Sequence, residues 1–150
     1  LVGAGPYKDH LAKMVSDLKV AGSITFIGRI EHADLPRYIS VGDVFAMPSR
    51  SRLAGLEVEG LGIVYLEASA CELPVIAGKS GGAPDAVLEG ETGITVDGTN
   101  PSEIAKAVIS LFDDPARASA MGKQGRQWIY DNWRWEIWAS KFNQLLYTNS

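Results

Sequence analysis

Residues 59–71 read EGLGIVYLEASAC, and this stretch predicts the central element of the fold. It opens on a carboxylate, Glu59, and two glycines, Gly60 and Gly62, and continues as an apolar run that indicates a buried helix. The start of such a helix offers free backbone amides and the positive end of the helix dipole to a phosphate or to polar sugar oxygens. The glycines would let a ligand come close to those amides.

The apolar run holds one charged side chain, Glu67, and a carboxylate on a buried helix is costly unless a partner hydrogen-bonds it. A pair of solvated glutamates is the ordinary alternative, but the apolar neighbours of Glu67 leave it little polar surface. A rise of about 1.5 Å per residue would set Glu59 and Glu67 roughly 12 Å apart along the axis. That spacing suits the two ends of an extended ligand better than an acid and a base acting on one atom.

Short apolar runs and helical patterns alternate along the chain. Strands are predicted at residues 1–2, 24–27, 44–47, 74–77 and 93–96, and helices after residue 5 and at 35–40, 101–112, 115–132 and 134–147. This order predicts an α/β fold with a Rossmann-like, doubly wound parallel sheet covered on both faces. The residues 59–71 and the glycine-bearing loop 78–85 both follow strands, so we expect them to meet at the carboxyl edge of the sheet.

Composition excludes several classes of function. The 150 residues make one domain with a net charge of −4 and no basic patch, so no nucleic-acid partner is expected. The only cysteine, Cys71, predicts no disulfide within the chain and a cytoplasmic setting. No apolar run reaches the ~18 residues of a membrane span, and His10 and His32 stand apart from any metal-ligand pattern. Because the chain begins inside a predicted strand without a methionine, we expect a piece of a longer protein.

Two further segments leave alternatives open. Gly3-Ala4-Gly5 would suit an NAD-binding turn, but the third glycine of that fingerprint falls on Lys8, which favours a plain turn from strand to helix. In the polar loop 50–57, Arg50 and Arg52 either meet an acidic ligand or face water.

Taken together, the sequence resembles the C-terminal, Rossmann-like half of the retaining GT-B glycosyltransferases of group 1. The resemblance covers nearly all 150 residues and is closest in wording to phosphatidylinositol-mannoside mannosyltransferases. It is carried by VGAGP, FIGRI, LPRYISVGDVFAMPSR, EGLGIVYLEASACELPVIAG, SGGAPD, TGITV and the Trp-rich tail, with two C-terminal helices over about 115–147.

The resemblance implies roles for the residues that match the family motif. Glu59 would be the catalytic carboxylate at the donor-sugar end, and Glu67 would accept hydrogen bonds from the ribose hydroxyls. Arg29 and Ile30 would lie against the base. The sugar hydroxyls and the pyrophosphate would be held by the backbone amides of Gly60, Leu61, Gly62 and Ile63.

The resemblance further implies hexosyl transfer from GDP-mannose, or from a UDP-sugar, to an acceptor hydroxyl, with no cofactor and no metal. The acceptor, a lipid or a saccharide, would bind an N-terminal domain absent from this chain, and a lipid would make the enzyme peripheral to a membrane. The basic clamp on the donor phosphates would also lie upstream, so this chain alone is expected to be inactive. A non-catalytic sugar-nucleotide-binding module and an NAD-dependent domain are the alternatives.

Two positions depart from the family pattern. Glu72 stands where glycine is usual at the end of the central helix, and a side chain in a left-handed conformation there costs about 1–2 kcal/mol. Asp85 stands where glutamate is common after the glycine pair.

Overall fold

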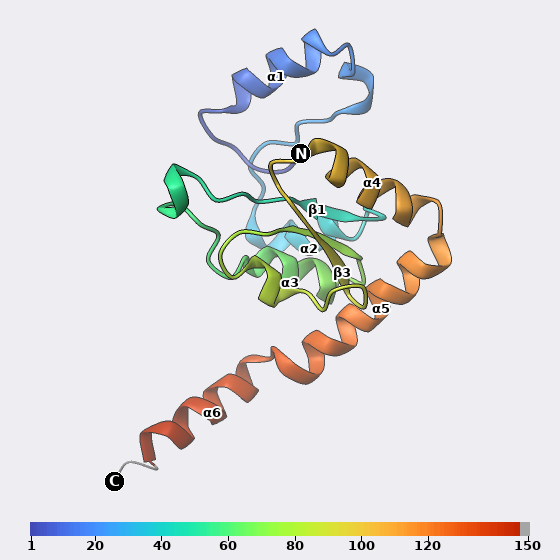
Figure 1. Ribbon diagram of the computed structural model, residues 1–150. Helices are drawn as coiled ribbons and strands as arrows, with labels where there is room; N and C mark the ends of the chain where they lie inside the picture. The colour runs from blue at the N-terminus through green and yellow to red at the C-terminus, as the bar shows by residue number, and fades with distance from the viewer. Residues whose placement is uncertain (148–150) are drawn as a thin grey trace. The chain divides into compact units, whose positions relative to one another are not determined.

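The computed structural model describes residues 1–147 and divides into two compact units (Figure 1). The first unit is Leu1–Arg37 and the second begins at Tyr38. The helix α2, Leu35–Ile39, is preceded by a 3-10 turn at His32–Asp34 and spans the point in the sequence where one unit gives way to the other.

The first unit holds the helix α1, Lys8–Asp17, between two extended segments. These segments run parallel but share one isolated bridge, Val2 with Gly28, in which the Gly3 amide donates to the Gly28 carbonyl over 2.7 Å. The two strands predicted at residues 1–2 and 24–27 are therefore wrong as regular, buried strands. The physical reason is that a two-stranded pair without a third strand beside it has little ladder and little core to stabilise it.

The second unit is built on a parallel sheet with strand order β1-β2-β3. Its strands are β1 (Phe45–Met47), β2 (Val75–Gly78) and β3 (Gly93–Val96). The ends of all three were predicted to within a residue or two. The register sets Ala46, Ile76 and Ile94 side by side on one face. The prediction of an α/β fold with a parallel sheet is confirmed, whereas the prediction of five sheet strands is wrong for the described residues.

Helices cover both faces of this sheet, as Figure 1 shows for α3 and α4. On one face lies α3, Ile63–Ala70, whose Tyr65 ring packs edge-on against Phe45 with 6.2 Å between centroids. The other face is covered by α4, Pro101–Phe112. The helix α5, Pro115–Asn132, contacts both α3 and α4. The core between the sheet, α4 and α5 is made of Ile76, Val96, Ala107, Leu111, Ala118 and Met121.

The predicted starts of the two long helices are confirmed by their caps. The Asn100 Oδ1 atom accepts from the amides of Ser102 and Glu103 at 3.1 and 3.2 Å, and Asp114 Oδ1 accepts from the Arg117 amide at 3.0 Å. Each cap satisfies amides that a helix start leaves unpaired. The last helix, α6, spans Trp135–Tyr147 and buries no residue in the described structure, so its large apolar side chains, such as Trp135 and Phe142, are exposed.

Residue Glu72 keeps the left-handed conformation that the sequence predicted to be strained, with φ +63°. It closes α3, because the Leu73 amide donates to the Ala68 carbonyl over 3.1 Å. Its backbone is held in place by α5, where a Cβ on Gly122 would collide with the Glu72 carbonyl oxygen. The side chain forms an exposed ion pair with Arg126 at 3.3 Å, a contact that stabilises by less than about 1 kcal/mol.

We expect Glu72→Gly to be more stable than Glu72→Ala by about 1 kcal/mol in the free energy of unfolding. Both substitutions remove the ion pair with Arg126, but only glycine relieves the positive φ. Urea unfolding of the two variants measures this difference directly. Equal stability of the glycine and alanine variants would show that the left-handed conformation carries no cost.

Candidate functional site

Three segments meet at the carboxyl edge of the sheet because glycines let their backbones touch. A Cβ on Gly78, at the end of β2, would collide with the backbone of Ser49, which follows β1. A Cβ on Gly81, whose φ is +53°, would collide with the Glu59 carbonyl oxygen. The predicted close approach at the glycine-bearing loop is thus an approach of protein backbone to protein backbone, and it fixes where Glu59 lies.

Hydrogen bonds fasten the segment that carries Glu59. The Gly82 amide donates to the carbonyls of Glu59 and Gly60 at 3.2 and 2.8 Å, and the Glu59 amide donates to the Ser80 hydroxyl at 3.2 Å. Ser80 is 2% exposed and its hydroxyl also bonds that of Ser51 at 3.1 Å. Sequence reasoning missed Ser80, since a serine beside two glycines reads as an ordinary loop residue.

The helix begins later than the sequence suggested. Its first residue is Ile63, and Gly62 caps it with φ +72° and ψ +64°, where a Cβ would collide with the ring of Tyr65. Glu59 therefore precedes the helix, and the spacing of about 12 Å along one axis is wrong. Glu67 lies four residues into α3, about 6 Å along the axis from Ile63.

A run of open amides marks the start of α3. Within residues 1–147, no acceptor pairs with the backbone N–H groups of residues 61–64, that is Leu61, Gly62, Ile63 and Val64. The Gly60 amide, the first of the four predicted donors, is taken by the Glu59 carboxylate through Oε1 at 3.2 Å. Val64 is a donor that the sequence did not single out. These amides and the helix dipole make the helix start attractive to an anion.

The carboxylate of Glu67 lies on an apolar pocket of about 390 Å³ between α3 and the α5–α6 region. Glu67 is half-buried and is the one charged residue that lines this pocket in the described chain. This carboxylate remains partly in water, and no donor among the described residues hydrogen-bonds it. The lining residues are Leu61, Ile63, Leu66, Glu67, Ala70, Ile129, Trp133, Trp135 and Trp138.

The remaining predicted residues lie elsewhere. Arg29 is exposed and Ile30 half-buried in the first unit, so their proximity to Glu67 stays a prediction. In the loop after β1, Arg52 forms an ion pair with Glu57 at 3.4 Å, and Arg50 is exposed.

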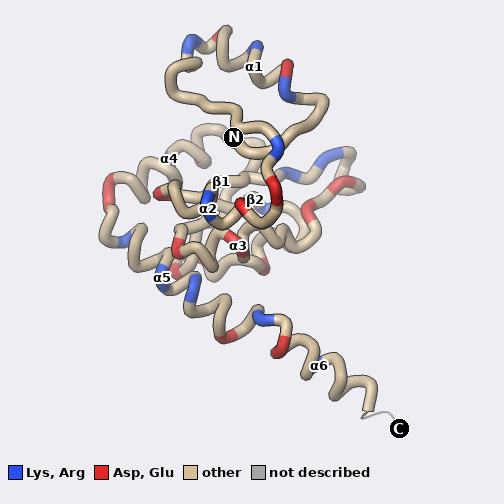
Figure 2. The backbone as a smooth tube through the Cα atoms, turned by 180° about the vertical axis from the view of Figure 1, so that it is seen from behind, with Lys and Arg blue, Asp and Glu red and all other residues tan. Residues whose placement is uncertain are grey.

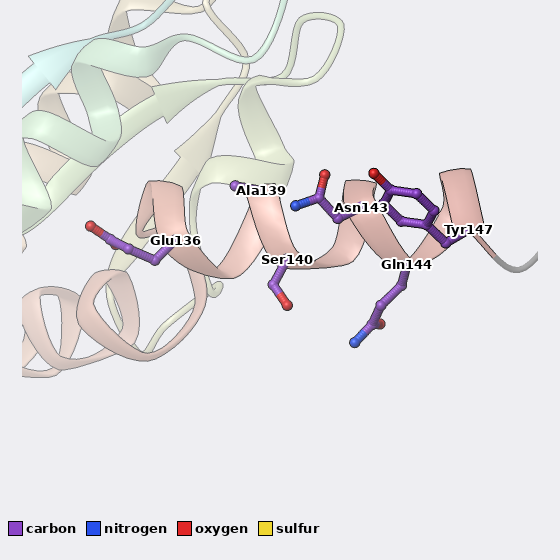
Figure 3. A pocket seen from close by; sticks show the side chains of 6 residues that line it. All are labelled: Glu136, Ala139, Ser140, Asn143, Gln144 and Tyr147. Carbon is purple, nitrogen blue, oxygen red and sulfur yellow. The ribbon is translucent and has the colours of Figure 1, made fainter.

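A hollow on the last helix differs from this site in its lining. A shallow hollow on α6 is lined by residues of that helix alone (Figure 3), and no side chain from another element closes it. Residues 1–147 hold no group of three or more metal-ligating side chains. None of the described helices is both long enough and apolar enough to span a bilayer.

The buried Tyr65 ties the start of α3 to the end of β1. Its hydroxyl donates to the Met47 carbonyl at 2.7 Å and bonds the Ser49 hydroxyl at 2.9 Å. Burial raises the pKa of Tyr65; the Ser49 hydrogen bond opposes this shift, and the nearby negative charge of Glu59 adds to it. A raised pKa means that the unfolded chain ionises first as the pH rises.

We therefore expect the free energy of unfolding to fall as the pH rises above about 10, the ordinary pKa of tyrosine. Tyr65→Phe should lose about 1–2 kcal/mol at neutral pH, because it removes two hydrogen bonds. It should then show a shallower fall in alkaline solution than the parent or the exposed control Tyr130→Phe. Urea unfolding across this pH range provides the measurement, and parallel slopes for all three proteins would contradict the expectation.

Comparison with known proteins identifies the family. The model of the family "Glycosyl transferases group 1" matches residues 1–128, which include the Gly3-Ala4-Gly5 turn. Over 97% of its length the chain is 54% identical to the GDP-mannose-dependent alpha-(1-6)-phosphatidylinositol monomannoside mannosyltransferase of Mycolicibacterium smegmatis and 49% identical to that of Mycobacterium tuberculosis. It is 44% identical to a GDP-mannose-dependent mannosyltransferase of Corynebacterium glutamicum that acts on the monoacylated lipid. The chain spans 38% of the length of each of these relatives.

Solved structures agree on the fold. The sucrose-phosphate synthase of Thermosynechococcus elongatus superposes on the whole chain with a TM-score of 0.87 and 32% identity, over 38% of that protein. The Anabaena HepE protein, solved with UDP, gives a TM-score of 0.86 over 99% of this chain and 40% of its own, but at 22% identity it supports the fold alone. Both confirm the prediction of a Rossmann-like half of a GT-B fold. The chain belongs to the group 1 glycosyl transferases and forms a domain of that family.

Proposed function

We propose that this chain is the donor-binding domain of a retaining mannosyltransferase that uses GDP-mannose. The observation that carries the proposal is the succession of Glu59, four open amides and Glu67 at the start of one helix. Support also comes from the curated relatives, whose names specify GDP-mannose and mannosyl transfer, at 44–54% identity. A UDP-sugar is the other donor that the sequence left open.

The open amides would bind the diphosphate of the donor. The amides of Leu61, Gly62, Ile63 and Val64 have no protein acceptor in the described structure, and the positive end of the α3 dipole adds to their attraction for an anion. The same groups would stabilise the charge that develops on the leaving diphosphate. The Gly60 amide becomes available to the sugar once the Glu59 carboxylate turns away from it.

The carboxylate of Glu67 would accept hydrogen bonds from the two ribose hydroxyls. It stands about one helical turn beyond Ile63, which leaves room for a ribose next to a diphosphate held at the helix start. Because no donor among residues 1–147 bonds its carboxylate, its lone pairs are available, and hydrogen bonds to an ionised acceptor are the stronger kind. Arg29 and Ile30 would lie against the base.

The carboxylate of Glu59 would contact the mannose at the reacting end. Its backbone is fixed by Ser80 and Gly82, so the side chain has a defined origin beside the helix start. The acceptor site and the basic phosphate clamp would lie outside these 150 residues, and the chain alone should not turn over. A cytoplasmic location and peripheral contact with a membrane complete the proposal.

We expect Glu67→Gln to weaken GDP binding by about tenfold or more, since a charge-assisted hydrogen bond becomes a neutral one. Calorimetric titration of the natural full-length protein with GDP, UDP and NAD measures the affinities and names the base. Glu136→Gln, an exposed carboxylate on α6, is the matched control and should bind as the parent does. Equal affinity of both variants for GDP would refute the ribose role of Glu67.

We expect Glu59→Gln to lower kcat for mannosyl transfer by about a hundredfold while GDP affinity changes little, because the lost interaction is at the sugar. Steady-state kinetics of the full-length protein, with Glu136→Gln as control, gives kcat and KM separately. A parent protein that binds GDP-mannose without turnover would instead support the non-catalytic module.

A further inference from the structure

The loop between β1 and the site exposes large apolar side chains. We call residues 50–58 the apolar loop. In it Leu53, Leu56 and Val58 are 62%, 86% and 54% exposed. Figures 1 and 2 both show the loop projecting from the carboxyl edge of the sheet, away from α4 and α5. No other described element of the second unit covers these side chains.

The tip of the apolar loop is ordered by hydrogen bonds. The Arg52 amide donates to the Glu57 carbonyl at 2.8 Å. The Arg52 carbonyl accepts from the amides of Glu57 and Gly55 at 3.2 and 3.0 Å. Leu53 and Ala54 adopt left-handed conformations, with φ +49° and +52°, which residues with side chains rarely take. Backbone strain held in place by such a network is typical of segments with a functional role. The exposed leucines are therefore presented by a defined structure.

The apolar loop is locally basic in an acidic chain. It holds Arg50 and Arg52 against the single acid Glu57, whereas the whole chain has a net charge of −4. Glu57 is already paired with Arg52, and Arg50 makes no ion pair among the described residues.

We propose that the apolar loop contacts an anionic phospholipid bilayer. Leu53 and Leu56 enter the interface between headgroups and acyl chains, and Arg50 lies at the lipid phosphates. Apolar side chains at a tip flanked by arginines fit such a surface, because burial of the leucines and attraction of the arginines act together.

The apolar loop directly precedes the candidate site in the sequence. Val58, its last residue, directly precedes Glu59, so a bilayer at the loop lies next to the site. The inference rests on the proposed function, since the curated relatives are named for transfer to phosphatidylinositol mannosides, which are membrane lipids. A lipid acceptor must present its hydroxyl without leaving the membrane. A contact surface beside the donor site brings the two substrates together.

The decisive experiment compares binding of full-length variants to vesicles. Leu53→Ser/Leu56→Ser should bind vesicles of phosphatidylcholine and phosphatidylinositol about tenfold more weakly than the parent in co-sedimentation. The matched control is Leu18→Ser/Ile109→Ser, two apolar residues that are 65% and 55% exposed elsewhere, and it should bind as the parent does. Melting temperature and GDP affinity should be the same in all three proteins.

A second variant tests the contribution of the Arg50 charge to vesicle binding. Arg50→Gln should weaken binding to vesicles that contain phosphatidylinositol by about fivefold and leave binding to pure phosphatidylcholine unchanged. Parent-like binding of the leucine variant would overturn the proposal. Loss of vesicle binding by that variant, in a protein that binds neither GDP nor UDP, would keep the lipid contact and refute the donor-binding function.

Discussion

The site depends on one buried hydroxyl. Tyr65 reaches from the first turn of α3 to the carbonyl of Met47 at the end of β1, over 2.7 Å, and to the hydroxyl of Ser49. These bonds lock the start of the helix to the sheet edge, while the ring fills the space that a side chain on Gly62 would need. Burial of the Tyr65 ring makes these hydrogen bonds costly to break. The open amides at the start of α3 are therefore held in a fixed position relative to the sheet.

Both ends of α3 are set by left-handed residues, but for different reasons. Gly62 adopts that conformation freely and ends the segment that leads into α3, where the amides of residues 61–64 have no acceptor among the described residues. Glu72 adopts it under strain, because Gly122 of α5 packs on its carbonyl. A short helix bounded in this way is held at both ends without being wholly buried, and its Glu67 face lines the apolar pocket.

The sequence predicted those features that depend on local chemistry. The caps at Asn100 and Asp114, the three apolar strands of the second unit and the strained Glu72 all follow from residue type and spacing. It did not predict the features that depend on packing contacts. The start of α3 was misplaced because the sequence does not show which of the two glycines adopts the left-handed conformation. Gly62 does so, and the ring of Tyr65 occupies the space that a Cβ on Gly62 would need. Ser80 acquires its role only because the loop after β2 folds against Glu59.

The charges of the site explain why such a domain would need help from elsewhere. A nucleoside diphosphate is an anion, yet the charged residues that flank the helix start in the sequence are the carboxylates Glu59 and Glu67. The helix dipole offers about half a positive charge, which does not balance them. Lys79, at the end of β2, is already paired with Glu103 at 3.5 Å. Because carboxylates suit hydroxyls, Glu59 and Glu67 would bind the sugar and the ribose in the function proposed above. The open amides would contact the phosphates, and cations outside the second unit would add to the affinity for them. A binding site divided in this way would assemble fully only when both sources of contact enclose the donor.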